Sequence, residues 1–327
     1  MIISQTPLRI SFVGGGTDLP SFYRLEGGAV VSTTIDKYVY VIAKERFDDQ
    51  IRVGYSQTEI ASSVDEIKHD LVREALRKTG VDDGLEIVTV ADIPSEGTGL
   101  GSSSSITVGL LNALYQYRGE PKEPMTLAEQ ACEIEIKALG KPIGKQDQYI
   151  AALGGLRKIV FHPNEEVSSE PIKIPGKTLR ALSRSLLLFY TGITRSADPI
   201  LREQQSNTRS KMETLRRMKE MATELEQELI RGNIEALGEM LHRGWCYKRE
   251  LARGITNPTI DEIYEVARRG GALGGKITGA GGGGFLLLYV PVDLQEKVRQ
   301  AIDGLREVPF NLERDGTKTL LNSRRPV

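Results

Sequence analysis

The sequence has few residues that could form a zinc site or a disulfide framework. It contains only two cysteines, Cys132 and Cys246, and three scattered histidines among 327 residues. Structural zinc sites usually need four Cys or His ligands at short spacings, and these cysteines lie far apart. We therefore expect two buried free thiols and no zinc site.

The sequence also lacks an excess of charge and a long apolar run. Its 43 Lys and Arg residues nearly balance 44 Asp and Glu residues, which gives a formal net charge of −1. Nucleic acids and acidic membranes attract basic surfaces, so neither is expected as a main partner. The opening MIISQTPLRI has no basic segment followed by a long apolar one, and no run reaches the length of a membrane span. These features indicate a cytoplasmic protein and leave open whether it forms homo-oligomers.

What is present is typical of a globular protein with two domains. Apolar residues make up 39% of the chain and charged residues 27%. A polar, turn-rich stretch, HPNEEVSSEPIKIPGK at 162–177, predicts a boundary between a domain at residues 1–170 and a second domain at 171–327. Strand and helix patterns alternate in both parts, which predicts an α+β fold.

Hydrophobic periodicity predicts the main elements. Strands are expected at 8–13, 29–45, 85–94 and 185–191, on both sides of the glycines at 279–284, and near 308–314, where a final strand closes the second domain. Helices are expected at 64–79, 106–115, 126–140, 212–229, 258–270 and 293–305. Thr126 and Glu129 fit a capping box at the start of the third of these helices.

Residues 97–105, GTGLGSSSS, place three glycines and four serines directly before an apolar helix. Glycine is costly to order, so the stretch needs a reason. One is a phosphate cradle, because the free N–H groups at a helix N-terminus attract anions and glycine permits close approach. The other is a flexible loop in which Ser102 or Ser103 caps the helix. The spacing fits neither a Walker A loop nor a Rossmann fingerprint, and the residues alone leave both interpretations open.

This loop is the second of three glycine motifs. PLRISFVGGGTD stands at 7–18 and KITGAGGGGF at 276–285. In this order and at these distances, the three motifs resemble those of the GHMP kinases, the superfamily of galactokinase, homoserine kinase, mevalonate kinase and phosphomevalonate kinase. The resemblance extends along the chain and implies a two-domain fold, with a mixed α/β N-terminal domain and a ferredoxin-like α+β C-terminal domain.

The resemblance implies that ATP and Mg²⁺ bind at the second motif. In the family this PxxxGLGSS-type motif surrounds the ATP phosphates, and its second serine, here Ser103, helps to hold magnesium. The matching residues are Pro94, Gly97, Gly99, Leu100, Gly101, Ser102, Ser103 and Ser104. The third motif, through Gly279, Gly281 and Gly282, lies beside the phosphate loop and shapes the substrate side.

Two residues are expected to act in phosphoryl transfer. GKQDQY at 144–149 resembles the segment that carries the catalytic aspartate of galactokinase-like members, which implies Asp147 as the general base. Arg9, from the first motif, is expected to hold that aspartate and the acceptor hydroxyl in register. The reaction needs an aligned nucleophile, a proton acceptor and cations on the migrating group, which these residues and Mg²⁺ would supply. Without the resemblance, a helix or turn cap would be the preferred interpretation of Asp147.

A glutamate before the aspartate is expected to complete the metal site, and Glu133 and Glu135 are the candidates. At about 100° per residue, Glu135 lies roughly 60° from the centre of the apolar helix face and Glu133 roughly 140° away. We therefore expect Glu135 to reach an interior site and Glu133 to face solvent.

Residues 15–18 bear on the choice of acceptor. Sugar kinases of the superfamily place an acidic residue at the position of Asp18, and a carboxylate accepts two hydroxyl hydrogen bonds in a fixed geometry. Galactokinases carry a Glu-His pair before the equivalent Thr-Asp, whereas this chain has Gly15 and Gly16 before Thr17 and Asp18. That difference disfavours galactose and leaves room for a bulkier or phosphorylated sugar.

The runs GGGTDLPSFY, GGAVVSTTIDKYVYV and GKQDQYIAALGG look most like the D-glycero-D-manno-heptose 7-phosphate kinases. This resemblance implies ATP-dependent phosphorylation of the anomeric C1 hydroxyl of a small sugar phosphate, to give the 1,7-bisphosphate. A phosphorylated acceptor needs cationic groups, and Lys145 and Arg195 are the candidates. Exposed surface positions are the alternative interpretation of both side chains.

Three other functions share part of the pattern. A related sugar 1-kinase, of the fucokinase or galactokinase type, would differ only in its acceptor pocket. A catalytically silent sugar sensor would not need Asp147, Arg9, Ser103 and Glu135 together. The decarboxylase branch of the superfamily, which acts on a diphosphorylated mevalonate, is disfavoured by the heptokinase-like segments.

Overall fold

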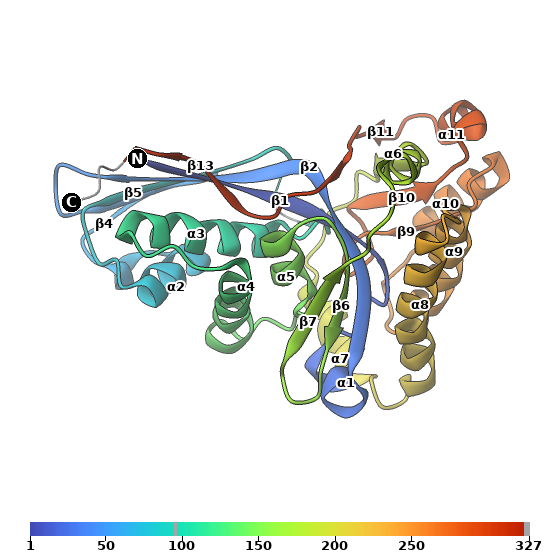
Figure 1. Cartoon of the computed structure of the whole chain (residues 1–327), viewed down its shortest axis with the longest axis horizontal. Helices are drawn as coiled ribbons and strands as arrows, with labels where there is room; N and C mark the ends of the chain where they lie inside the picture. Colours follow the sequence, from blue (N-terminus) through green and yellow to red (C-terminus); the bar gives the residue numbers. More distant parts are fainter. Residues whose placement is uncertain (95–96, 324–327) are drawn as a thin grey trace.

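The computed structural model describes residues 1–94 and 97–323, and most of its strands form one large sheet (Figure 1). These strands are β1 (Ile2–Val13), β2 (Gly28–Glu45), β3 (Ile51–Gly54), β4 (Thr58–Ala61), β5 (Leu85–Ala91), β6 (Leu156–Phe161), β7 (Val167–Pro171), β12 (Leu312–Glu313) and β13 (Lys318–Asn322). Their main order is β13-β1-β2-β5-β3-β4, with β12 and β6 also pairing with β2, and β7 pairing with β6.

The long strand β2 joins the two ends of this sheet. Its residues 28–33 pair antiparallel with β6 and its residues 39–45 with β5, while β1 runs antiparallel along most of its length. Val, Ile, Thr and Tyr are frequent in β2, and these residues favour a pleated, half-buried strand. The strands predicted at 8–13 and 29–45 are confirmed, and they are neighbours in the sheet.

Helices cover one face of the large sheet (Figure 1). They are α2 (Asp70–Thr79), α3 (Ser102–Arg118), α4 (Pro124–Cys132) and α5 (Gln146–Leu153). α3 and α5 pack on β1 and β2, while α2 and α4 pack against α3 from outside. Because α3 has the sheet on one side and helices on the other, it is apolar around most of its circumference. This packing fixes the N-terminus of α3.

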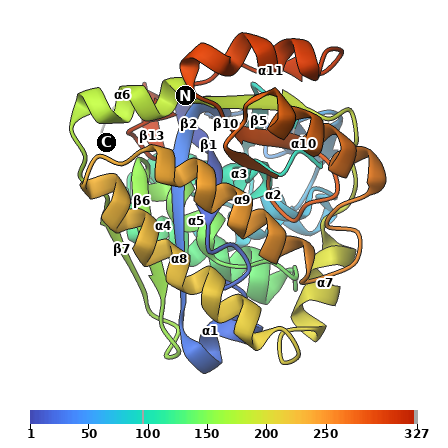
Figure 2. The ribbon, with the colours of Figure 1, turned by 90° about the vertical axis from the view of Figure 1, so that its right-hand side faces the viewer.

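A smaller sheet and a layer of long helices form the rest of the molecule. The sheet contains β8 (Leu186–Tyr190), β9 (Gly274–Ile277), β10 (Phe285–Tyr289) and β11 (Arg306–Glu307), in the order β11-β8-β10-β9. α8 (Met212–Ile230) and α9 (Glu235–Arg249) lie side by side (Figure 2). The remaining helices are α1 (Pro20–Glu26), α6 (Gly176–Arg184), α7 (Asp198–Ser206), α10 (Pro258–Gly270) and α11 (Gln295–Ala301), with short 3-10 turns η1 (Val64–Glu66) and η3 (Val292–Leu294).

The end of the chain returns to the large sheet. β11 pairs with β8 of the smaller sheet, but β12 pairs with β2 and β13 pairs with β1. The expectation that a final strand near 308–314 closes the second domain is therefore wrong. β1 would otherwise present unpaired N–H and C=O groups along one edge, and β13 covers them. The division into residues 1–170 and 171–327 stays a prediction.

Two predicted helix starts are also wrong. The helix expected at 64–79 begins at Asp70, because the chain is extended at Ile67 and the ring of His69 caps α2. The capping box at Thr126 is not formed, since α4 already begins at Pro124. Proline suits the first turn of a helix because its fixed φ is helical and it has no N–H to leave unpaired there.

The two cysteines differ in burial. Cys132 is buried and Cys246 is half-buried, so the expectation of two buried thiols holds only for Cys132. Burial raises the pKa of the Cys132 thiol well above its usual value, which keeps it protonated and unreactive.

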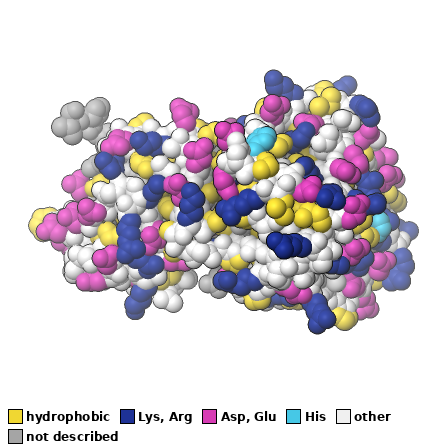
Figure 3. Space-filling view, turned by 90° about the horizontal axis from the view of Figure 1, so that it is seen from below, with side chains coloured by type: hydrophobic (Ala, Val, Ile, Leu, Met, Phe, Trp, Pro, Cys, Tyr) yellow, Lys and Arg dark blue, Asp and Glu magenta, His cyan; other side chains and the backbone are white. Residues whose placement is uncertain are grey.

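The outer surface carries charges of both signs. On the face in Figure 3, Lys and Arg side chains alternate with Asp and Glu side chains. Within the ranges that the structure describes, no helix has the length and apolar character needed to cross a bilayer.

Candidate active site

The three glycine motifs line one cavity of about 660 Å³. The first motif contributes β1 and the loop after it, the second the loop before α3, and the third the turn between β9 and β10. Several residues at 141–147 and all of 194–198 complete much of the wall. The cavity therefore draws on residues from both ends of the chain.

The loop before α3 has the backbone of an anion cradle. Gly97, Gly99 and Gly101 have φ values of 68°, 72° and 78°, which residues with side chains rarely adopt. A Cβ on Gly99 would lie 2.6 Å from the carbonyl oxygen of Thr278, so the second and third motifs touch through bare backbone. Gly101 is the N-cap of α3 and no side chain of the described residues caps the helix, which leaves its first N–H groups free beside the cavity. This geometry favours the phosphate cradle.

The serines at the start of α3 do not cap it. The hydroxyls of Ser103 and Ser104 each donate to the carboxylate of Glu135 at 2.8 Å. The hydroxyl of Ser102 is buried without a hydrogen-bond partner among the described residues. The interpretation in which Ser102 or Ser103 caps the helix is therefore wrong, and all three serines line the cavity instead.

Two other residues of the predicted nucleotide motif, Leu100 and Pro94, do not line the cavity. Leu100 is fully buried, and its carbonyl accepts a hydrogen bond from the backbone N–H of Arg9 at 3.0 Å. Positions 95 and 96 of the motif lie outside the described residues.

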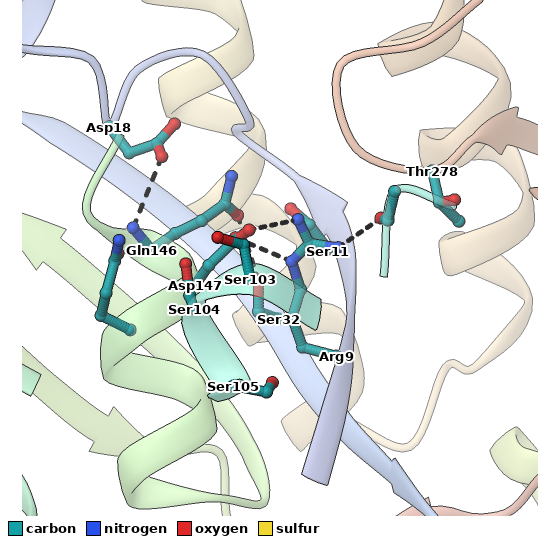
Figure 4. A network of polar contacts seen from close by, with 12 residues as sticks. Arg9, Ser11, Asp18, Ser32, Ser103, Ser104, Ser105, Gln146, Asp147 and Thr278 are labelled. Carbon is teal, nitrogen blue, oxygen red and sulfur yellow. Dashed lines mark hydrogen bonds and ion pairs between the residues drawn. The ribbon is translucent and has the colours of Figure 1, made fainter. Parts of the chain in front are cut away.

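Arg9 and Asp147 form a two-pronged ion pair (Figure 4). Nε of Arg9 donates to Oδ1 of Asp147 at 2.8 Å, and Nη2 donates to Oδ2 at 2.6 Å. Nη1 donates to the carbonyl of Gly99 at 2.6 Å, which ties the pair to the glycine loop. Arg9 comes from β1 and Asp147 from the first turn of α5. The Asp147 side chain keeps 22% of its surface exposed and lines the cavity, so a bound molecule can reach its carboxylate.

Glu135 is a buried carboxylate directly behind the serines. It lies on η2 (Glu133–Ala138), a π-helical turn that continues α4, and it also accepts a hydrogen bond from the amide of Gln148 at 2.6 Å. Burial raises the pKa of the Glu135 carboxyl above its usual value, and the hydrogen bond from Ser104 opposes that rise. Ser103 lines the cavity and donates a hydrogen bond to Glu135, which lies behind it. The oxygen atoms of the two side chains therefore form one cluster.

Glu133 lies on the other side of the same turn. Its side chain is 42% exposed and pairs with Lys78 at 2.6 Å. The predicted inward placement of Glu135 and outward placement of Glu133 is confirmed.

The oxygen atoms of Ser103 and Glu135 fit a magnesium ion. Mg²⁺ prefers hard oxygen ligands and usually takes only one or two from protein carboxylates, completing its shell with phosphate oxygens and water. Among the residues that the structure describes, no group of three or more His, Cys, Asp or Glu side chains could hold a metal by itself.

Asp18 is a second buried carboxylate in the cavity wall. Its Oδ1 accepts from the backbone N–H of Gly16 at 2.9 Å, and its Oδ2 accepts from that of Gln146 at 3.5 Å (Figure 4). Burial raises the pKa of Asp18 above its usual value, and the hydrogen bond from Gly16 works against it. Lone pairs on both oxygens remain available to a ligand.

The neighbours of Asp18 have different positions. Gly15 and Gly16 line the cavity, as the sequence predicts for an open acceptor pocket. Thr17 does not line it, because its hydroxyl is buried and donates to the carbonyl of Gly14 at 2.8 Å. Thr17 thus fixes the loop that presents Asp18.

The two basic residues predicted to bind a remote phosphate lie in different surroundings. Lys145 does not line the cavity; its ammonium pairs with Glu165 at 2.6 Å. Arg195 does line it, and its Nε and Nη2 are buried without hydrogen-bond partners among the described residues. Burial lowers the pKa of Arg195, and none of the described carboxylates forms an ion pair with its guanidinium.

The third motif supports Arg195 as well as lining the cavity. Gly279 and Gly281 are lining residues, whereas Gly282 lies against the Arg195 guanidinium. A Cβ on Gly282 would come within 1.7 Å of Cζ of Arg195, so only glycine leaves that guanidinium its place.

Sequence reasoning missed three lysines of the cavity, Lys141, Lys248 and Lys276, of which the last two are buried. Lys248 on α9 and Lys276 on β9 are only 6% and 8% exposed, and both line the cavity. Burial lowers the pKa of Lys248 to about 8 and that of Lys276 to about 7. Lys276 donates to the carbonyl of Ser11 at 2.9 Å. It is the first residue of KITGAGGGGF and could have been found from that motif, whereas no local pattern marks Lys248 in HRGWCYKRE.

Two family models match separate parts of the chain. Residues 67–155 match the GHMP kinases N terminal domain, and residues 221–308 match the GHMP kinases C terminal domain. The first match contains the glycine–serine loop, Glu135 and Asp147, and the second contains Lys248 and the third glycine motif.

Individual proteins are similar over nearly the whole chain. A D-glycero-alpha-D-manno-heptose 7-phosphate kinase from Campylobacter jejuni is 30% identical, over 88% of this chain and 89% of its own. An L-fucokinase/L-fucose-1-P guanylyltransferase from Bacteroides fragilis is 27% identical over 91% of this chain, which corresponds to 35% of that longer protein. The crystal structure of a D-glycero-D-manno-heptose 1-phosphate kinase from Bacteroides thetaiotaomicron superposes with a TM-score of 0.82 at 25% identity, covering 99% of this chain and 100% of that one.

Proposed function

The chain belongs to the GHMP kinases and is an ATP-dependent sugar kinase, and from this premise we propose that it phosphorylates the C1 hydroxyl of D-glycero-D-manno-heptose 7-phosphate. The product is the 1,7-bisphosphate. The observation that carries the proposal is the Arg9–Asp147 pair, which borders the same cavity as the free N-terminus of α3. The heptose 7-phosphate kinase relative supports the choice of acceptor.

The proposed reaction uses both the N-terminus of α3 and the Arg9–Asp147 pair. The phosphates of ATP lie at the N-terminus of α3, against the N–H groups that the glycine loop leaves free. Asp147 accepts the proton of the C1 hydroxyl while that oxygen bonds to the γ-phosphorus and the bond to the leaving ADP oxygen breaks. Arg9 holds both oxygens of Asp147, so the carboxylate cannot turn away from the hydroxyl.

Ser103 and Glu135 hold Mg²⁺ in this proposal. The ion neutralises charge on the ATP phosphates when it is bound. Burial has already raised the pKa of Glu135, so a nearby cation would stabilise its ionised form.

The acceptor binds beside Asp18, which accepts hydrogen bonds from sugar hydroxyls. Arg195 binds the remote phosphate, because its guanidinium lines the cavity, has unused N–H groups and faces no carboxylate partner. We do not extend that role to Lys145, since Glu165 already neutralises its charge outside the cavity.

A fucose 1-kinase is the second candidate, favoured by the similarity to an L-fucokinase/L-fucose-1-P guanylyltransferase. ADP release from ATP, measured with a panel of acceptors, separates the candidates. The panel contains heptose 7-phosphate, heptose 1-phosphate, free heptose, L-fucose and D-galactose. We expect the highest kcat/KM with heptose 7-phosphate. A higher value with L-fucose or with heptose 1-phosphate would overturn the proposed acceptor.

A further inference from the structure

Lys248 brings an ammonium from the C-terminal half of the chain into the cavity wall. It lies on α9 near the end of the helix, and its Nζ donates to the side-chain carbonyl of Gln204 on α7 at 2.9 Å. Gln204 is only 1% exposed, so this hydrogen bond holds the ammonium in one place. A charged lysine is rarely buried to this degree unless it has a partner or a function.

The groups around Lys248 leave hydrogen-bonding capacity unused. An ammonium has three donors, and among the described residues only the hydrogen bond to Gln204 occupies one of them. The hydroxyl of Ser11 lines the same cavity, belongs to a residue that is 7% exposed, and has no partner among the described residues. Buried polar groups in native proteins are nearly always paired, so an unpaired hydroxyl at a cavity wall indicates a ligand partner.

Asp18 supplies the complementary acceptor. Its negative charge acts on both Lys248 and Lys276, which places these three charged groups, together with Arg9, in one electrostatic neighbourhood. A phosphate here would meet the Asp18 carboxylate, whereas no described carboxylate forms an ion pair with Arg195. A wall that offers an ammonium and a hydroxyl beside a carboxylate matches neighbouring hydroxyl groups, which both donate and accept.

Lys276 has a different role in the same wall. Its ammonium donates to the carbonyls of Ser11 at 2.9 Å and Phe12 at 3.4 Å, so two of its three donors are taken by the backbone of β1. This fixes the strand that carries Ser11 and leaves Lys248 as the more available donor.

We propose that Lys248 and Ser11 join Asp18 in binding adjacent hydroxyls of the acceptor sugar, which makes Lys248 a specificity-determining residue. The inference rests on the sugar kinase function and not on the presence of a remote phosphate. Lys248 donates to one hydroxyl oxygen, and Asp18 accepts from a neighbouring hydroxyl. Through Lys248, helix α9 contributes to the selection of the acceptor sugar.

Deoxy analogues of the acceptor test this assignment. The parent acceptor is the sugar of the panel above that the wild-type enzyme uses with the highest kcat/KM. The role of Lys248 can therefore be tested even if heptose 7-phosphate is not that sugar. Analogues that each lack one hydroxyl are compared in wild type, Lys248→Met and Ser11→Ala, with the exposed Lys297→Met on α11 as the control.

We expect kcat/KM of Lys248→Met for the parent sugar to fall roughly 10- to 100-fold, as for the loss of one charge-assisted hydrogen bond, with the KM for ATP unchanged. One deoxy analogue should be disfavoured by wild type and Lys297→Met but used by Lys248→Met as well as the parent sugar. If Lys248→Met discriminates against every analogue as wild type does, the assignment is wrong. If Lys248→Met does not fold, Ser11→Ala tests the same site, because it removes a hydroxyl that has no hydrogen-bond partner among the described residues. Discrimination by Ser11→Ala against every analogue, as in wild type, would then show that the assignment is wrong.

Discussion

Asp147 is the residue on which the proposed chemistry depends most. Asp147→Asn keeps the shape of the side chain but removes its ability to accept a proton. Turnover should fall by roughly 10²- to 10⁴-fold, the usual contribution of a general base, while ATP binding is retained. Steady-state kinetics and nucleotide titration measure the two effects separately. Near-normal turnover of this variant would show that another group accepts the proton.

Glu135 and Glu133 form a matched pair on one helical turn. Glu135→Gln should raise the magnesium concentration needed for half-maximal activity, because it removes the buried carboxylate beside Ser103. Glu133→Gln loses only partly exposed ion pairs, with Lys78 and Lys137, so its magnesium dependence should stay within about twofold of wild type. Activity measured over a range of magnesium concentrations gives both values. Equal effects of the two substitutions would contradict the proposed metal site.

Arg195→Ala should raise the KM for a phosphorylated acceptor and leave the KM for the free sugar nearly unchanged. A charge-assisted hydrogen bond to a phosphate contributes about 1.5–3 kcal/mol, so Arg195→Ala should raise the KM for heptose 7-phosphate by about tenfold or more. Free heptose has no phosphate to lose, and its KM should change little. Kinetics with the two acceptors, in wild type and variant, test this difference. A parallel rise in both KM values would indicate a structural role for Arg195.

At the scale of elements, the turn between β6 and β7 ties two site segments together. Glu165 on this turn has a φ of 74° and is the one non-glycine residue with positive φ among those described. Its carboxylate accepts from Lys145 at 2.6 Å, from Tyr23 at 2.7 Å and from Arg24 at 2.6 Å. Lys145 lies two residues before Asp147, and Tyr23 and Arg24 lie on α1, which follows Asp18. One carboxylate thus connects the two acidic loops of the cavity.

This connection predicts a dependence of stability on pH. Burial alone would raise the pKa of Glu165, but the hydrogen bonds from Lys145, Tyr23 and Arg24 lower it to about 2. Its usual value is 4.5, so the folded state binds the proton more weakly than the unfolded chain. The contribution is present above pH 4.5 and is lost as the pH falls toward 2.

Melting temperatures between pH 6 and pH 3 test that dependence. Wild type should lose stability on acidification more steeply than Glu165→Gln, and Glu166→Gln should follow wild type. The difference should be about 1 kcal/mol or less, because water screens a carboxylate whose side chain is 44% exposed. Identical pH profiles of wild type and Glu165→Gln would contradict the role of this ion pair.

Elements with a strong hydrophobic period could be predicted from the sequence. The helix predicted at 212–229 is α8, and the apolar residues from Leu215 to Leu229 in that prediction are buried. The helix at 258–270 and the strands around the third motif are also confirmed. Helix starts were less predictable. The sequence pattern indicated starts at residues 64 and 126, whereas the cap at His69 and the proline at position 124 set the starts of α2 and α4. The π-helical turn at Glu133 has no sequence signature, although the inward placement of Glu135 was still predictable.

At the scale of the whole molecule, the site depends on contacts between distant parts of the chain. The motifs predicted that Arg9, Asp147 and the glycine loop meet, since their order and spacing identify the family. Nothing local predicts that Lys248 reaches the cavity or that β13 pairs with β1, because both follow from how the helix layer and the chain end pack. Site residues that only the packing of distant segments brings to the cavity can therefore be identified only in the structure.

The position of the new phosphate on the product tests the proposed reaction most directly. Heptose 7-phosphate and ATP are incubated with the wild-type enzyme, and the product is examined by phosphorus–proton correlation NMR. We expect a bisphosphate in which the new phosphorus couples to the anomeric proton at C1. Coupling of the new phosphorus to any other ring or side-chain proton, or ADP release without a new sugar phosphate, would contradict the proposed reaction.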